Sequence, residues 1–194
     1  MAPILGIYAS QISGHLFAPS GAYDSIATVT PYTTTTSVVF SSIPSGYTHL
    51  QIRAIAKNGT GSGGETSILA QFNSDTTYTN YFGRHLLYGD GSTAAAAANN
   101  TSGWTGGAAG GIAQQSTSNV FAASIIDILD YSNTSKNKTV RTLAGADYNG
   151  SGTLLFTSSL WMNTNAITSI TLKPFADTFG ANSHFALYGI KGGN

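Results

Sequence analysis

The fold class follows from residues 49–59, HLQIRAIAKNG. The polar residues His49, Gln51 and Arg53 alternate here with apolar neighbours, and the run closes on Asn-Gly, a common hairpin-turn dipeptide. A period of two places alternate side chains on opposite faces of an extended strand. The stretch therefore predicts a half-buried β-strand that ends in a turn.

Similar signals return along the rest of the chain, where Thr, Val, Ile, Tyr and Phe are frequent and turn residues come at short intervals. Pro44-Ser45-Gly46 is one such turn signal, because proline fixes φ and glycine tolerates a positive φ. About eight to ten strands without a helix predict an all-β fold, an antiparallel two-sheet β-sandwich that is jelly-roll-like. The predicted strands are 24–30, 33–43, 49–57, 68–72, 76–88, 119–131, 139–146, 153–162, 167–173 and 184–190.

The length of 194 residues predicts one β-sandwich domain, residues 23–194, preceded by an apolar N-terminal segment, residues 1–22. That segment holds no charge and shows neither a helical nor a strand period. Two interpretations stay open: a first strand of the core, or an extended arm that docks on a neighbouring subunit. In the second interpretation the partner-binding residues are Ile4, Leu5, Ile7, Tyr8, Ile12, Leu16 and Phe17.

A second unusual segment is residues 92–115, which is rich in Ala, Gly and Asn and has Trp104 in its middle. Its glycine-rich flanks offer no helix caps, so a long surface loop is predicted, of the kind that is often functional. Trp104 either stacks on a sugar ring or anchors a partner, or it pins its own loop to the sandwich. The tyrosines that would join it in a stacking platform are Tyr78, Tyr81 and Tyr88.

Charge is scarce: 8% of residues are charged, against about 25% in an ordinary domain, and the net charge is zero. With 41% hydrophobic residues the chain folds, but its surface is mostly neutral. Eight basic residues balanced by eight acids argue against nucleic-acid binding, and no apolar run is long enough to span a membrane. The remaining charges cluster around Arg53, Lys57 and residues 136–141, where solvent contact or specific ion pairs are expected.

No residue pattern predicts catalysis, a cofactor or a metal, so the chain is expected not to be an enzyme. The four histidines lack metal-ligand spacing, and there is no cysteine. Asp127 and Asp130 could be imagined as a glycosidase pair, but residues three apart on a strand face opposite sides of the sheet. Asp130 also stands where a turn is expected, and Asp90 between two glycines is a turn residue.

Several segments, which together span nearly the whole chain, match the sequence of a known family in the same order. They are PILGIYASQISGHL (3–16), DSIATVT (24–30), VVFSSIPSGYTHLQIRAIAK (38–57), SIIDILDYSNTSKNKTVRTLAGADYNGSG (124–152), LWMNTNAITSITL (160–172) and FALYGIK (185–191). With these segments the chain resembles a family of small β-rich virion proteins of tailed bacteriophages, especially cyanophages. The resemblance weakens over residues 92–115, where loop variation is expected.

The resemblance implies a structural role on the particle rather than an activity. It implies a capsid cement or decoration protein, or a fibre-associated one, that forms a homotrimer and binds the major capsid protein or another virion protein. Such a protein is made in the cytoplasm of the host bacterium and is found in the virion. The competing hypothesis is a fibre or capsid-displayed module that binds a host glycan.

Overall fold

The computed structural model describes residues 22–59, 66–90, 92–97, 108–113, 120–148 and 152–192, with backbone alone for residues 84–88, 97 and 108–113. Within these residues the regular structure is almost all β. The elements are β1 (Tyr23–Val29), β2 (Val38–Phe40), β3 (His49–Ala56), β4 (Thr66–Phe72), η1 (Tyr78–Asn80), β5 (Tyr81–Gly89), β6 (Ala94–Ala97), β7 (Ala108–Ala113), β8 (Ala122–Leu129), β9 (Lys138–Asp147), β10 (Gly152–Trp161), β11 (Ile170–Pro174) and β12 (His184–Ile190).

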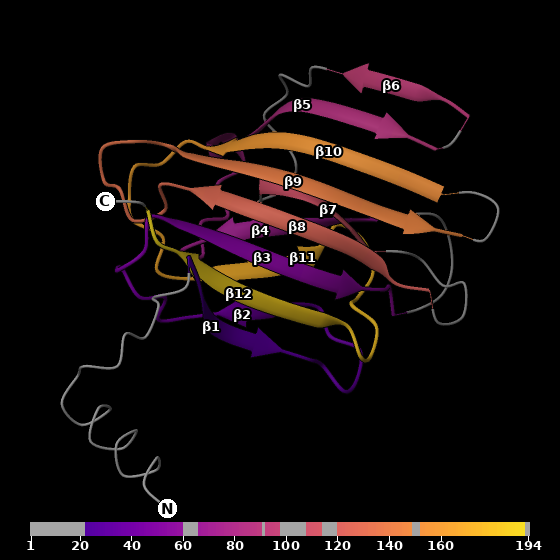
Figure 1. The fold of residues 1–194 in the computed structure, drawn as a ribbon, viewed down its shortest axis with the longest axis horizontal. Coiled ribbons are helices and arrows are strands. Elements are labelled where there is room, and N and C mark those ends of the chain that lie inside the picture. The colour runs from indigo at the N-terminus through magenta and orange to yellow at the C-terminus, as the bar shows by residue number, and fades with distance from the viewer. Residues whose placement is uncertain are drawn as a thin grey trace, which may run out of the picture.

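The strands form two antiparallel sheets that pack face to face (Figure 1). The larger sheet has eight strands in the order β1-β12-β3-β8-β9-β10-β5-β6, and the smaller has four in the order β2-β11-β4-β7. Figure 1 looks onto the larger sheet, with the smaller one behind it. In the described part of the chain, no helix is long and apolar enough to cross a membrane.

The connectivity is that of a jelly roll with two added hairpins. Four strands of each sheet, β1-β12-β3-β8 and β2-β11-β4-β7, make up two facing Greek-key sheets of four. The antiparallel pairs β9–β10 and β5–β6 extend the larger sheet past β8. The predicted all-β, two-sheet, jelly-roll-like sandwich is confirmed. Strand β8, which has apolar residues on both faces, is central in its sheet.

The core lies between the two sheets and joins residues of both. The rings of Phe72 and Trp161 lie 5.4 Å apart between their centroids, and those of Phe179 and Phe185 lie 4.7 Å apart. Inward residues of β3 and β8 are fully buried, as the alternation in residues 49–57 predicted. Apolar burial of this kind is the main favourable term in folding, so the sandwich is held chiefly by this one cluster.

Two expectations from the sequence are wrong in detail. Residues 94–97 and 108–113, within the loop predicted at 92–115, are strands β6 and β7. Ala and Gly have low strand propensity, but β6 pairs with β5 and β7 with β4, and such backbone pairing overrides propensity. The turn near Pro44 uses no positive φ at Gly46; the left-handed residue is Ser42, with φ 54°, and the predicted strand 33–43 shortens to β2.

A glycine in β12 provides a test of this packing. A Cβ added to Gly189 would lie 2.4 Å from atoms of the Tyr47 ring, whereas at Gly46 it would meet nothing within 4 Å. We expect Gly189→Ala to lower the free energy of unfolding by about 1–3 kcal/mol, because the ring must move. Gly46→Ala is the matched control, and urea denaturation should show it close to wild type. Equal stability of the two variants would contradict this placement of Tyr47.

Candidate protein interface

The outer face of the larger sheet carries apolar side chains that nothing in the described chain covers. Ile125 of β8 pairs in register with Leu143 of β9, and Leu143 pairs with Phe156 of β10. Directly paired residues on one face of an antiparallel sheet have neighbouring side chains. All three residues point away from the core, so they form a continuous apolar row across three strands.

Two further residues extend this row. Leu154 precedes Phe156 by two positions on β10, and Ile55 pairs with Ala123, two positions before Ile125. These five side chains are 37–57% exposed. A contiguous exposed apolar patch of this kind is typical of a protein interaction site. We call Ile55, Ile125, Leu143, Leu154 and Phe156 the outer apolar band.

A row of hydrogen-bonded polar residues borders the band. Gln51, Asp127 and Arg141 are paired in register across β3, β8 and β9. Gln51 donates from Nε2 to Oδ1 of Asp127 at 2.8 Å, and Arg141 donates to Oδ2 of Asp127 at 2.9 Å. The Asp127 charge is thus already paired with Arg141, and the row sets a polar margin beside an apolar surface.

Arg53 lies on the same face, opposite Ile125 in register. Its Nε donates to Oε1 of Gln51 at 2.9 Å, and its guanidinium lies 5.3 Å from the ring centroid of Tyr188 and 5.9 Å from that of Tyr23. Among the described residues no carboxylate lies within ion-pairing distance of it. The structure therefore holds an exposed guanidinium in place without neutralising it.

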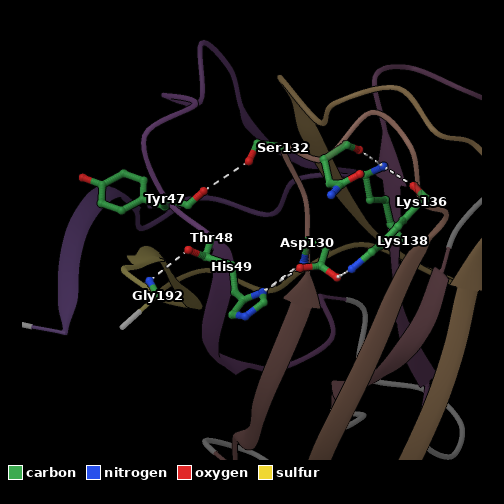
Figure 2. Close-up of polar contacts among 9 residues, drawn as sticks. Tyr47, Thr48, His49, Asp130, Ser132, Lys136, Lys138 and Gly192 are labelled. Atoms are coloured by element: carbon green, nitrogen blue, oxygen red, sulfur yellow. Dashed lines mark hydrogen bonds and ion pairs between the residues drawn. The ribbon is translucent and has the colours of Figure 1, made fainter. Parts of the chain in front are cut away.

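The second polar cluster lies at one end of the sandwich, in the turn after β8 (Figure 2). Asp130 has φ 53°, as suits the turn residue the sequence predicted, and its carboxylate lies 3.3 Å from Nζ of Lys136. The Asp130 N–H donates to Nδ1 of His49 at 3.0 Å. Oδ1 of the Asp130 carboxylate lies 3.8 Å from the same Nδ1.

Lys136 and Arg141 form ion pairs, as expected for residues 136–141, whereas Lys138 in the same cluster does not meet that expectation. Its side chain is fully buried, and Nζ donates to the carbonyl oxygens of Asn133, Lys136 and Thr164 at 2.7, 2.6 and 3.0 Å. An ammonium group has three donors, so all of them are satisfied by the backbone. Burial lowers the pKa of Lys138, and the nearby Asp130 charge opposes that shift. This cluster supports the turn rather than a ligand.

Of the predicted stacking platform, the structure describes the side chains of Tyr78 and Tyr81 only, and Tyr81 does not fit the prediction. Tyr81 is 1% exposed: its ring packs near Phe72, and its hydroxyl donates to the Asp75 carbonyl, so it cannot stack on a sugar. Burial raises the pKa of Tyr81 to about 12. Tyr78, in η1, is 46% exposed. Trp104 lies outside the described residues, and Tyr88 is described by its backbone alone.

The predicted arm residues Ile4, Leu5, Ile7, Tyr8, Ile12, Leu16 and Phe17 also lie outside the described residues. The imagined carboxylate pair does not form a site, since Asp127 is on the outer face with Arg141 and Asp130 is in the turn with Lys136. In the described part of the chain, no three His, Cys, Asp or Glu residues gather as metal ligands would.

Sequence reasoning missed the outer apolar band. The available signal is the presence of apolar residues on both faces of residues 119–131, which a strand buried on both faces would also show. Solvent exposure of one of those faces depends on there being no second layer over it.

Comparison with known proteins adds little to the geometry. No protein-family model matches the chain, and no curated protein is similar to it. Among solved structures, a protein of unknown function from Shewanella oneidensis MR-1 aligns at 8% identity with a TM-score of 0.26, covering 90% of this chain and 78% of that chain. A likeness at that level says nothing about what this chain does.

Proposed function

We propose that this protein is a virion structural protein, a homotrimeric capsid cement or decoration protein that binds the major capsid protein through the outer face of its larger sheet. The observation that carries the proposal is the outer apolar band on the broad open face of a jelly roll. The resemblance of the sequence to phage virion proteins supports the same role.

The energetics of the band suit assembly. Its five side chains are each about half exposed, and covering them would stabilise a complex by about 5 kcal/mol before the costs of association. A trimer that engages three such faces at once gains further through the high effective concentration of its second and third contacts. The five side chains of the band carry no charge, so covering the band itself desolvates no charged group.

The test is co-sedimentation with capsids of the phage that encodes the protein, purified without it. We expect the double variant Leu143→Ser/Phe156→Ser to lose at least about tenfold in capsid affinity, because two central side chains of the band become polar. Both residues are exposed, so the thermal midpoint should stay close to that of wild type.

The matched control is Val39→Ser/Met162→Ser, which removes two exposed apolar residues outside the band. It should sediment with capsids like wild type. Sedimentation equilibrium would test the trimer directly. A band variant that binds capsids as well as wild type, or a wild type that does not bind them, contradicts the proposal.

The second candidate is a fibre or capsid-displayed module that binds a host glycan, and the exposed ring of Tyr78 favours it. The burial of Tyr81 argues against the glycan role, because a buried ring cannot stack on a sugar. A glycan array with wild type, Tyr78→Ala and Trp104→Ala separates the two functions. Binding above background that both variants reduce would support the glycan role in place of capsid docking.

A further inference from the structure

We propose that Arg53 and the outer apolar band together form a site for an acidic side chain flanked by apolar residues, presented by a different protein. This inference rests on the docking role proposed for the outer face. It adds the chemistry of the partner, and it does not depend on that partner being a capsid protein.

Three neighbouring side chains fix the position of the Arg53 guanidinium. Gln51 accepts its Nε–H at 2.9 Å, and Gln51 is itself held by Asp127 at 2.8 Å. The rings of Tyr23 and Tyr188 lie under the guanidinium on the side of β1 and β12. Because the Nε–H is used inside the chain, the terminal nitrogens remain as the fork that recognises a carboxylate.

The charges around Arg53 are unbalanced in a way that favours an acidic partner. Arg141 is paired with Asp127 at 2.9 Å, whereas Arg53 has no acidic partner among the described residues. Asp147, the acid at the far end of the same face of β9, already has an interaction of its own. The polar row and Arg53 therefore carry a net charge of one positive unit beside the outer apolar band. Covering this face with apolar groups alone would bury that charge unpaired, which is costly, so a complementary partner brings a carboxylate.

The described part of the chain offers no acid that suits this role. Residues 1–22 contain neither Asp nor Glu, so an arm from a second copy would leave Arg53 unpaired. Each of the seven aspartates already has an interaction within its own chain, and Glu65 lies outside the described residues. The pairs are Asp24 with Lys191, Asp75 with Asn80, Asp90 with Ser92, Asp127 with Arg141, Asp130 with Lys136 and Asp177 with Thr178. Asp147 has an interaction as well.

A sugar is a poorer match for the same surface. Stacking on a sugar needs a free ring face, and the rings of Tyr23 and Tyr188 both lie beside the Arg53 guanidinium. The apolar part of the adjoining surface is aliphatic apart from Phe156. The polar row beside it already uses the Gln51 amide and the Arg141 guanidinium for hydrogen bonds to Asp127. A protein segment with one acid among Leu, Ile or Phe satisfies both the charge and the apolar area.

The experiment is selection of a displayed library of random 12-residue peptides on the immobilised full chain, followed by affinity measurements on the winning peptides. We expect them to carry Asp or Glu within a few positions of large apolar residues. Arg53→Gln should weaken their binding about 30-fold, as loss of a charge-assisted hydrogen bond implies, and added salt should weaken wild-type binding. Arg53→Lys keeps the charge without the two parallel N–H donors, so its affinity for the peptides should lie between those of wild type and Arg53→Gln.

Lys173→Gln, which removes a positive charge from β11 in the smaller sheet, is the control and should bind the peptides like wild type. Peptides without an enriched acid, or acidic peptides that bind Arg53→Gln equally well, would overturn the inference. So would selective binding of uronic acids on a glycan array, or a change in oligomer mass caused by Arg53→Gln.

The two proposals can fail separately. If Leu143→Ser/Phe156→Ser loses capsid binding while Arg53→Gln keeps it, the docking face stands and the acidic anchor is wrong. If the chain never binds capsids but selects acidic peptides through Arg53, the anchor stands and the virion role is wrong.

Discussion

We expect Lys138→Met to lower the free energy of unfolding by about 3 kcal/mol, because three carbonyl oxygens lose their donor in a buried site. Nζ of Lys138 joins the turn carbonyls of Asn133 and Lys136 to that of Thr164, which follows β10. Methionine fills a similar volume but donates nothing. Guanidinium denaturation should show a lower midpoint with an unchanged slope.

Lys136→Met is the matched control, since Lys136 stands two residues earlier in the same turn. Its ammonium group is exposed and contacts Asp130 at 3.3 Å, and a surface ion pair of this kind contributes less than about 1 kcal/mol. Equal losses in the two variants would show that the Lys138 ammonium is not the support of this turn.

The second large effect is expected for Asp75→Ala, a loss of about 3 kcal/mol. Oδ2 of Asp75 accepts hydrogen bonds from Asn80 and from Nε1 of Trp161, both at 2.8 Å, and Oδ1 accepts the Thr77 N–H at 2.9 Å. Trp161 is fully buried, so without Asp75 its indole N–H is left unsatisfied in the core. Urea denaturation monitored by tryptophan fluorescence measures the loss.

Asp90→Ala tests whether the buried donor is the cause. Asp90 also accepts backbone N–H bonds in a turn, from Ser92 and Thr93, but that turn is exposed. We expect a much smaller loss for this variant. A loss as large as that of Asp75→Ala would assign the effect to turn formation and not to Trp161.

The same carboxylate links stability to pH. Burial acts to raise the pKa of Asp75, but hydrogen bonds from Asn80, Trp161 and Thr77 outweigh it and hold the pKa below its ordinary 3.8. As pH falls, the unfolded chain therefore takes up this proton first, and stability present above about pH 4 is lost as the pH passes through the folded pKa. Asp75→Asn should flatten this fall, although Asp24 and Asp90, whose pKa values are also lowered, keep part of it.

Much of the secondary structure could be predicted because it depends on local alternation of polar and apolar residues and on turn residues. Residues 184–190 were predicted as a strand with the bounds that β12 has, and the alternation from His49 to Lys57 predicted β3. Strands β6 and β7 could not be predicted, because Ala and Gly give no strand signal. They form by backbone pairing, β6 in a hairpin with β5 and β7 with the earlier strand β4.

The exposed and buried side chains of the candidate sites could not be predicted from the sequence, because exposure and register depend on tertiary packing. Tyr78 and Tyr81 are three residues apart and have the same side chain, yet Tyr78 is exposed and Tyr81 is buried. The Tyr81 hydroxyl donates to the Asp75 carbonyl and accepts the Phe72 N–H. Likewise Ile125, Leu143 and Phe156 come from three strands, and only their register brings them into one row.

By itself, the amino-acid sequence determined an all-β, two-sheet class, a neutral surface and the outward or inward alternation along individual strands. Those properties depend on neighbouring residues, because a period of two decides which side chains share a face. Only the tertiary structure decided the strand order, which face of the larger sheet the described residues leave exposed, and the placement of Arg53 beside the outer apolar band. Backbone hydrogen bonds join any two extended strands, so partner and register are selected only when the whole core packs.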